Sequence, residues 1–240
     1  MRRYKGIICI VIFMCVFLPL WFIYLYRNPT FSFRSPIELG LFLGTGAGYN
    51  WIVLHESLYL LLEFCLSMQI IPQINEQSLT RMTRREHWNG VWKNLFAGAA
   101  IFCVTFCAIH LLMTFLYVPY EILFDYDFVF IWGMFLIRML GIYMVFNGIF
   151  ALAYSFLLKK EYAIAVCAVF QMLLILFSRY PWASGITRDM EVYNEFYSSG
   201  GLDVFQYFLD EIKHVLWVAL LYIGSVYVFE KKDILNGKKL

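Results

Sequence analysis

Residues 128–158 read FVFIWGMFLIRMLGIYMVFNGIFALAYSFLL and contain one charged residue, Arg138. A helix needs about 20 apolar residues to cross the hydrocarbon core of a bilayer, and this run is longer than that. The whole chain has the same character, because 62% of its 240 residues are hydrophobic and only 15% are charged. Soluble domains contain about 45–50% apolar and about 25% charged residues. The sequence therefore predicts an all-α polytopic membrane protein.

Six apolar runs divide the chain, and we interpret each run as one transmembrane helix. They cover residues 6–26, 39–71, 95–118, 128–158, 162–178 and 215–229. The first run follows basic residues, as the hydrophobic part of a signal peptide does. It is too long for that role and no cleavage site of small residues follows it, so we expect it to remain as an anchor. The prediction is a single transmembrane domain over residues 1–240.

The distribution of lysine and arginine indicates the orientation. If both termini are cytoplasmic, thirteen of the 19 basic residues lie on the inner segments and five on the outer segments, with Arg138 inside the membrane. Cytoplasmic loops of membrane proteins carry an excess of Lys and Arg. We therefore predict a multi-pass protein of the cell membrane with both termini cytoplasmic. A net charge of +2 gives no indication of nucleic-acid binding.

The second run, residues 39–71, is too long for one perpendicular crossing, because a single helix of that length would reach about 50 Å. It must tilt, project beyond the bilayer or break. Its first part carries a stripe of small residues at i, i+4 and i+8, namely Gly40, Gly44 and Gly48. Such stripes allow helices to approach closely in lipid. We favour packing within the chain, with the surface of a partner helix as the alternative.

Two segments outside the spans are long enough to carry function. In residues 73–93 the apolar pair Leu79 and Met82 is surrounded by Arg81, Arg84 and Arg85, a pattern that predicts a short basic helix on the cytoplasmic side. This helix either docks an acidic partner or only fixes the topology.

The second segment, residues 179–214, has helical spacing of apolar residues over 190–197 and 202–212, with a Ser-Ser-Gly-Gly break between them. We predict two short amphipathic helices at the outer membrane surface. They either cover a pathway through the membrane or form a simple connection.

Ionisable residues within the spans need partners, because each costs several kcal/mol in the membrane unless it is paired or hydrated. Arg138 lies near the middle of the fourth span, and Glu56 and Glu63 share one face of the second. We predict that Arg138 pairs with one of these two carboxylates. The pair either lines a polar route or fixes the geometry of the bundle. His55 and His110 are further candidates for the same polar interior.

Catalytic motifs are incomplete in this sequence. No P-loop sequence is present, so we do not expect the chain to hydrolyse ATP by that mechanism. His55 and Glu56 begin like the helix of a zinc protease, but Tyr59 stands where the second histidine belongs. Three possible soft-metal ligands on one helix cannot surround an ion without a fourth ligand from elsewhere; these are Cys103, Cys107 and His110. We expect no catalytic residue, metal or cofactor.

Six spans with cytoplasmic ends, the basic loop 73–93 and the broken outer segment 179–214 together resemble the ABC-2-type permease subunits of ABC exporters. The size is similar to that of permeases in Gram-positive peptide or bacteriocin export and self-immunity systems. The resemblance implies export of a peptide or another hydrophobic or amphipathic substrate. It also implies pairing with a second copy or a sister permease. A separate ATP-binding subunit would dock on the basic loop through Leu79, Arg81, Met82, Arg84 and Arg85.

Two alternatives from other classes stay open. One is a non-transporting immunity or scaffold protein of the membrane. The other is an intramembrane enzyme, protease-like or metal-dependent, that uses His55, Glu56, Glu63, Cys107 or His110.

Overall fold

The computed structural model describes residues 2–27, 33, 35–43, 59–70, 83–177, 192–198 and 203–231. All elements in these ranges are helical: α1 (Arg2–Arg27), α2 (Pro36–Leu41), α4 (Leu60–Ile70), α6 (Arg84–Tyr117), α7 (Tyr120–Asp125), α8 (Phe128–Leu157), α9 (Lys160–Phe177), α11 (Val192–Ser198) and α12 (Val204–Lys231). Within the described ranges, α6, α8 and α12 are long and apolar enough to cross a membrane. The all-α class is confirmed, and multi-pass membrane insertion is plausible.

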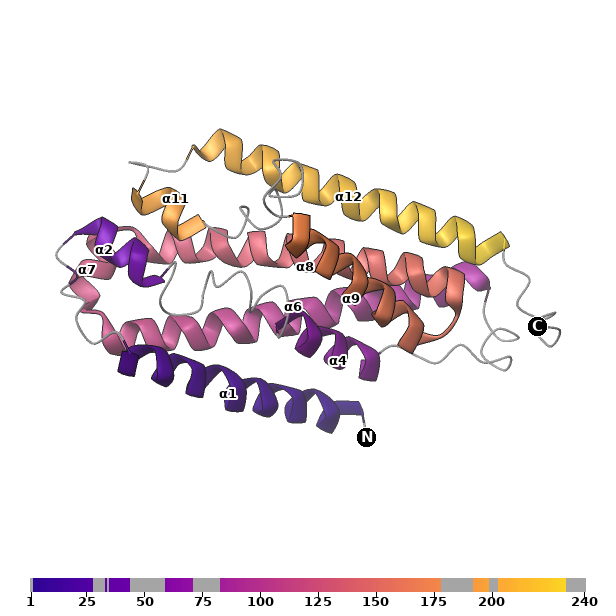
Figure 1. Ribbon diagram of the computed structural model, residues 1–240, viewed down its shortest axis with the longest axis horizontal. Coiled ribbons are helices and arrows are strands. Elements are labelled where there is room, and N and C mark those ends of the chain that lie inside the picture. The colour runs from indigo at the N-terminus through magenta and orange to yellow at the C-terminus, as the bar shows by residue number, and fades with distance from the viewer. Residues whose placement is uncertain are drawn as a thin grey trace.

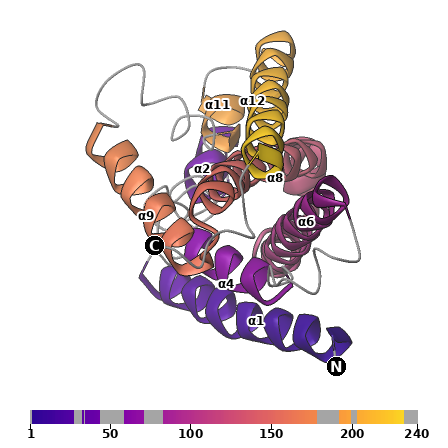
Figure 2. The same ribbon diagram turned by 90° about the vertical axis from the view of Figure 1, so that its right-hand side faces the viewer.

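The three long helices run side by side along the long axis of the bundle (Figure 1). Helix α8 packs against α12, α6 and α9, while α1 and α4 lie against α6 and against each other. Figure 2 shows the same bundle from one end, with α12 on α8 and α1 on the far side of α4. The central helix is therefore α8, and α12 is attached to the bundle mainly through it.

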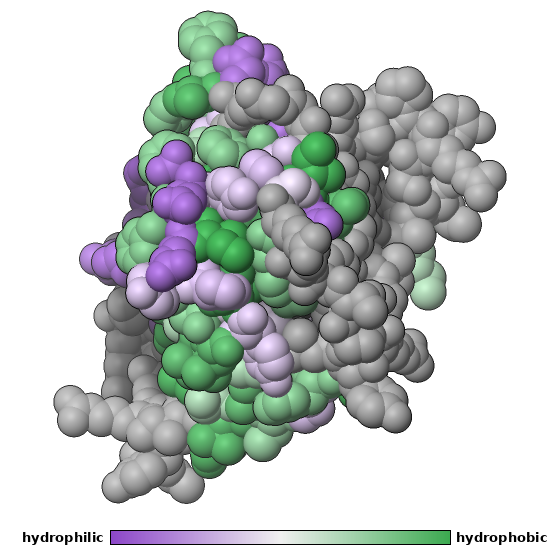
Figure 3. Space-filling view, turned by 90° about the vertical axis from the view of Figure 1, so that its left-hand side faces the viewer, coloured by the Kyte–Doolittle hydropathy of each residue, from purple (hydrophilic) through white to green (hydrophobic). Residues whose placement is uncertain are grey.

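The two ends of the bundle carry opposite charges. At one end α1 and α6 begin and α8 and α12 end (Figure 1). We call it the basic end, because its described side chains include Arg84, Arg85, Lys159, Lys160 and Lys231. The opposite end is formed by α2, α7 and α11 with the start of α12. We call it the acidic end, and Figure 3 shows its hydrophilic residues gathered along one side. It carries Glu38, Glu121, Asp125, Asp127, Glu195 and Asp203.

The bounds of α6 follow from local chemistry. Thr83 and Glu86 form a capping box, in which the Glu86 amide donates to the Thr83 hydroxyl at 3.2 Å and the Thr83 amide donates to the Glu86 carboxylate at 2.9 Å. Pro119 disfavours helical backbone at the residue before it, and α6 ends at Tyr117. Its 34 residues span about 51 Å, which exceeds the hydrocarbon core of a bilayer.

Several predicted bounds agree with the structure. The predicted spans 128–158 and 162–178 match α8 and α9 to within two residues at each end, and the predicted span 95–118 lies in α6 except for its last residue. The helix expected over 190–197 is present as α11.

Three other predicted segments differ from the structure or are only partly described by it. Within residues 39–71, α2 ends at Leu41 and α4 begins at Leu60, and residues 44–58 lie outside the described residues. Whether this run tilts, projects or breaks stays a prediction. A short basic helix is expected in residues 73–93, and from Arg84 onward this segment is helical as the start of α6, so the helix continues directly into the third predicted span. Residues 202–212 do not form a separate surface helix, because α12 continues from Val204 to Lys231 and includes the predicted span 215–229. No glycine or proline interrupts the chain from Val204 to Ile223, so the amphipathic pattern belongs to the first part of one long helix.

Glycines allow α8 and α12 to approach closely. A Cβ atom on Gly148 of α8 would lie 2.8 Å from Leu221 Cδ1 and 3.0 Å from Leu221 Cβ of α12. A Cβ on Gly141, two turns earlier, would lie 3.2 Å from a Glu211 carboxylate oxygen. By contrast, a Cβ on Gly133 of the same helix would have no neighbour within 4 Å. We call the contact at Gly141 and Gly148 the glycine seam.

We predict that Gly148→Val lowers the free energy of unfolding by about 1–3 kcal/mol, because the added methyl groups force α12 away from α8. Thermal unfolding in mild detergent, followed by circular dichroism, measures this loss. Gly133→Val is the matched control and should change the stability by about 0.5 kcal/mol or less. Equal losses in the two variants would contradict close packing at the glycine seam.

Candidate functional site

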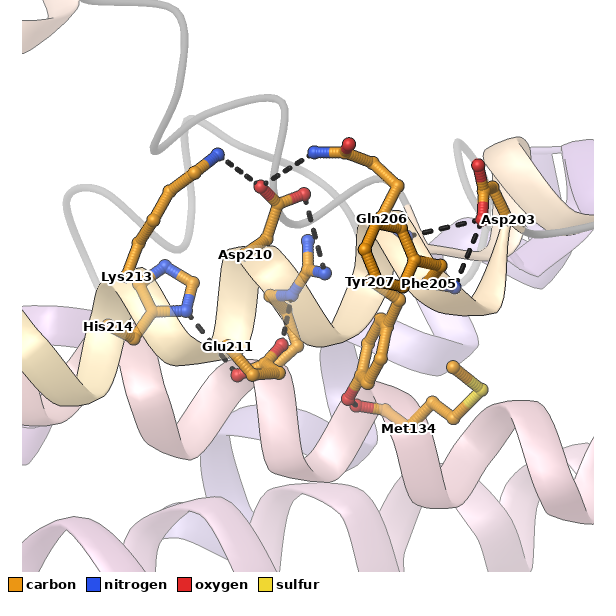
Figure 4. A network of polar contacts seen from close by, with 10 residues as sticks. Met134, Asp203, Phe205, Gln206, Tyr207, Asp210, Glu211, Lys213 and His214 are labelled. Atoms are coloured by element: carbon orange, nitrogen blue, oxygen red, sulfur yellow. Dashed lines mark hydrogen bonds and ion pairs between the residues drawn. The ribbon is translucent and has the colours of Figure 1, made fainter.

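A buried arginine is the centre of the main polar network between α8 and α12. The side chain of Arg138 is only 2% exposed. Its Nε donates to Glu211 Oε1, and its Nη2 lies 4.0 Å from Asp210 Oδ2. The guanidinium carbon also lies 4.6 Å from the centre of the Tyr207 ring. Two carboxylates and an aromatic face thus compensate the buried charge. Figure 4 shows the three residues of α12 that provide them, Tyr207, Asp210 and Glu211.

Further contacts join this network to both helix backbones. The Tyr207 hydroxyl donates to the Met134 carbonyl of α8 at 2.7 Å. His214 Nδ1 lies 3.4 Å from Glu211 Oε2 (Figure 4), whereas Arg138 bonds to the other oxygen of this carboxylate, Oε1. Gly141 leaves room for these groups, since a Cβ there would lie 3.3 Å from His214 Nδ1. The close approach of α8 and α12 therefore depends on a small residue beside the carboxylate.

The network also reaches the surface of α12. Lys213, whose side chain is 62% exposed, pairs with Asp210. Gln206 Nε2 donates to the same carboxylate at 3.1 Å. Asp210 therefore joins the buried guanidinium to exposed polar groups on the surface of α12.

The predicted partners of Arg138 require a correction. Its carboxylates come from Asp210 and Glu211 of α12, and not from Glu63 of α4. Glu56 lies outside the described residues. The physical reason is that α8 packs directly on α12, whereas α4 packs on α6. The pattern of residues 202–212 predicts a surface helix, and a surface helix would not bring Asp210 and Glu211 to Arg138.

A signal for this pairing is present in the sequence. One face of a helix through this segment carries aromatic, acidic and imidazole groups at spacings of three and four, namely Tyr207, Asp210, Glu211 and His214.

A second buried polar contact joins three helices. Asn147 Nδ2 of α8 donates to Glu63 Oε1 of α4 at 2.9 Å and to the Leu95 carbonyl of α6 at 3.3 Å. Both Asn147 and Glu63 are fully buried. Glu63 therefore belongs to the interior of the bundle, as expected for an intramembrane carboxyl, but with an amide as a hydrogen-bond donor.

The predicted cysteine and histidine face of α6 packs against neighbouring helices. His110 Nδ1 accepts a hydrogen bond of 2.6 Å from Trp21 Nε1 of α1. Cys107 Sγ lies 4.0 Å from Met139 Sδ, and Cys103 is fully buried. Across the ranges that the structure describes, no group of three or more His, Cys, Asp and Glu residues could hold a metal ion. His55 lies outside those ranges.

The small residue Gly40 contacts another helix of the same chain. A Cβ on Gly40 would lie 2.5 Å from Tyr197 Cβ of α11. The Tyr197 hydroxyl donates to the Tyr126 carbonyl at 3.0 Å, and burial together with nearby Asp127 raises the pKa of Tyr197 above its ordinary value. Packing within the chain, the favoured interpretation of the stripe, therefore holds at Gly40. Gly44 and Gly48 lie outside the described residues.

At the basic end, the start of α6 is fixed to the end of α12. Trp88 Nε1 and Trp92 Nε1 each donate to Ser225 Oγ at 3.0 Å. The Trp88 ring stacks on Phe229 with a centroid distance of 4.4 Å. We call this contact the tryptophan–serine clamp. The sequence pattern alone does not predict that these two tryptophans and Ser225 lie together.

The predicted docking residues lie beside this clamp or outside the described ranges. Arg84 Nη1 donates to the Glu230 carbonyl at 2.9 Å, so its side chain spans α6 and α12. Arg85 is exposed. The remaining three docking candidates, Leu79, Arg81 and Met82, lie outside the described residues.

We predict that Arg138→Met lowers the free energy of unfolding by about 3–5 kcal/mol, because it leaves two carboxylates without their buried cation. The double variant Arg138→Met with Glu211→Met should lose less than the two single variants added together. Unfolding in mild detergent over this double-mutant cycle measures the coupling. As a control, the exposed Lys213→Met should cost about 1 kcal/mol or less. Additive losses at the two positions would contradict the pairing.

We also predict that Ser225→Ala lowers the stability by about 1–3 kcal/mol, since two buried indole donors lose one shared acceptor. Ser155→Ala on α8 is the control, because the Ser155 hydroxyl donates to the Leu152 carbonyl of its own helix. Its loss should be smaller. The same thermal measurement separates the two variants, and a cost at Ser225 no larger than at Ser155 would count against the clamp.

Comparison with known proteins finds no matching family model, no matching curated protein and no matching solved structure.

Proposed function

We propose that this chain is the permease subunit of an ABC exporter, with six transmembrane helices, both termini cytoplasmic and a separate ATP-binding subunit. The observation that carries the proposal is the position of the α6 start. Arg84 and Arg85 lie at the basic end, where Arg84 bonds to the α12 backbone and Arg85 is exposed. A cytoplasmic partner that pushes on this point acts on two long helices at once.

The arrangement of the helices supports the topology. Helix α1 begins and α12 ends at the same end of the bundle, as an even number of crossings requires (Figure 1). Among the described residues, that end carries Arg84, Arg85, Lys159, Lys160 and Lys231, and cytoplasmic loops are enriched in lysine and arginine. Helices α6, α8 and α12 are long and apolar enough for three of the proposed spans. In the proposed topology, α1, α9 and the segment 39–71 supply the other three.

The continuity of α6 supports a coupling role. Its first turn precedes an uninterrupted helix of 34 residues, and the tryptophan–serine clamp holds its start against Ser225 of α12. A displacement at Arg84 and Arg85 therefore moves α12 relative to α8. The glycine seam and the Arg138 network are the contacts that resist such a displacement. In this way, ATP-driven closure of a partner reaches the far end of the bundle.

The surface of the bundle suits an apolar or amphipathic substrate such as a peptide. A groove between α6 and α8 is lined only by apolar or aromatic side chains, among them Val104, Leu111, Trp132 and Leu136. The far side of α12 is also apolar, with Leu216, Leu220 and Ile223 exposed. We include a second copy or a sister permease in the proposal, because one six-span subunit provides half of the usual pathway of this transporter class.

We predict that an ATP-binding protein co-purifies with the tagged chain from mild detergent and is lost in the triple variant Arg81→Glu/Arg84→Glu/Arg85→Glu. Charge reversal at the α6 start repels an acidic docking surface. The partner is identified by its P-loop sequence and by ATPase activity of the complex, which the chain alone should lack. The experiment requires expression in the native host, where the partner gene is present.

The matched control reverses three other cations of the basic end, as Lys159→Glu/Lys160→Glu/Lys231→Glu. This control should retain the ATP-binding partner, provided that both variants unfold at the temperature of the wild type. Intact wild-type protein that emerges without such a partner would overturn the proposal and favour a non-transporting scaffold. Partner loss in both variants would show a general charge effect instead of docking at α6.

A further inference from the structure

We propose that the basic end binds the headgroups of anionic phospholipids through Lys159, Lys160 and Lys231, with the acyl chains lying along the adjoining helices. We call these three residues the lysine site. The proposal requires only that this end lies at a membrane surface, and it holds with or without an ATP-binding partner.

The lysine site is assembled on converging helix ends. The Trp88 ring lies between two aromatic rings, with centroid distances of 5.8 Å to Tyr154 of α8 and 4.4 Å to Phe229 of α12. Lys159 follows Tyr154 by five residues, and Lys231 follows Phe229 by two. The packing of one indole therefore holds the ends of α8 and α12, and the lysines that follow them, at the same level of the bundle.

Two of these lysines are set against exposed tyrosines. Lys159 Nζ lies 5.1 Å from the centre of the Tyr162 ring, and Lys231 Nζ lies 4.2 Å from that of Tyr227. The rings are 55% and 57% exposed. Tyrosine is enriched where a membrane meets water, and lysine beside it extends its ammonium group toward the headgroups. These pairs place the membrane surface at the lysine site.

The chemistry on the two sides of this level fits an amphiphile. Toward the middle of the bundle the exposed side chains are apolar, including Phe156, Val166 and Ile223. At the end itself the cations outnumber the acidic groups Glu86, Glu161 and Glu230. An anionic headgroup complements this excess of positive charge. A free phosphate satisfies only the charges, whereas a phospholipid also covers the apolar band.

The test compares two brominated lipids as quenchers of tryptophan fluorescence. The full chain is reconstituted in vesicles of phosphatidylcholine that contain brominated phosphatidylglycerol or brominated phosphatidylcholine. We expect the wild type to prefer phosphatidylglycerol, and each single variant, Lys159→Gln or Lys231→Gln, to lose about fivefold in that preference. The triple Lys→Gln variant should show no preference. Its thermal unfolding in pure phosphatidylcholine should equal that of the wild type, which separates lipid binding from folding.

Lys213→Gln, in the first half of α12, is the matched control and should keep the preference. Equal quenching of the wild type by both lipids would overturn the proposal. An equal loss in Lys213→Gln and Lys231→Gln would do the same, because it would reduce the effect to net charge. Displacement of the brominated phosphatidylglycerol by inorganic phosphate alone would identify a free-anion site. The two proposals are distinguishable, because a variant can lose the lipid preference and keep the ATP-binding partner, or lose the partner and keep the lipid preference.

Discussion

The ion pair between Arg138 and Glu211 is the constraint on which the arrangement of α12 depends. A guanidinium that is 2% exposed inside an apolar bundle has lost its hydration, and only nearby negative charge compensates that loss. The carboxylates stand on α12, so this helix has to lie directly on α8 at the level of Arg138. Because Asp210 and Glu211 are adjacent in sequence, they also fix the rotation of α12 about its axis.

From that fixed rotation the rest of the α8–α12 interface follows. His214 and Leu221 lie one and about three turns beyond Glu211, on the face that meets α8, and the glycines of the seam stand opposite them. Ser225 then reaches Trp88 and Trp92 of α6 at the basic end. The same face thus changes from ionic to apolar to hydrogen-bonding along its length. Each level requires a small or complementary residue on the neighbouring helix.

The sequence was sufficient where structure is decided locally. Pro119 and the apolar runs located α8, α9 and the end of α6 to within a few residues, since helix length and termination depend on neighbours in the chain. The sequence was insufficient to identify the partner of Arg138. Hydrophobic periodicity shows that a face is buried but not which helix covers it. Both Glu63 and Glu211 were available as carboxylates, and only the packing of α8 against α12 distinguishes them.

The tryptophan–serine clamp and the Arg138 network together have a mechanical consequence. The tryptophan–serine clamp joins α12 to α6, whereas the Arg138 network joins α12 to α8. Between them, the contact of Gly148 with Leu221 is held by dispersion, which weakens gradually when helices slide. Helix α12 is thus attached to a different neighbour at each end. A displacement of α6 relative to α8 must therefore tilt α12, or break either the tryptophan–serine clamp or the Arg138 network. The exposed far side of α12 leaves lipid or another chain free to follow that tilt.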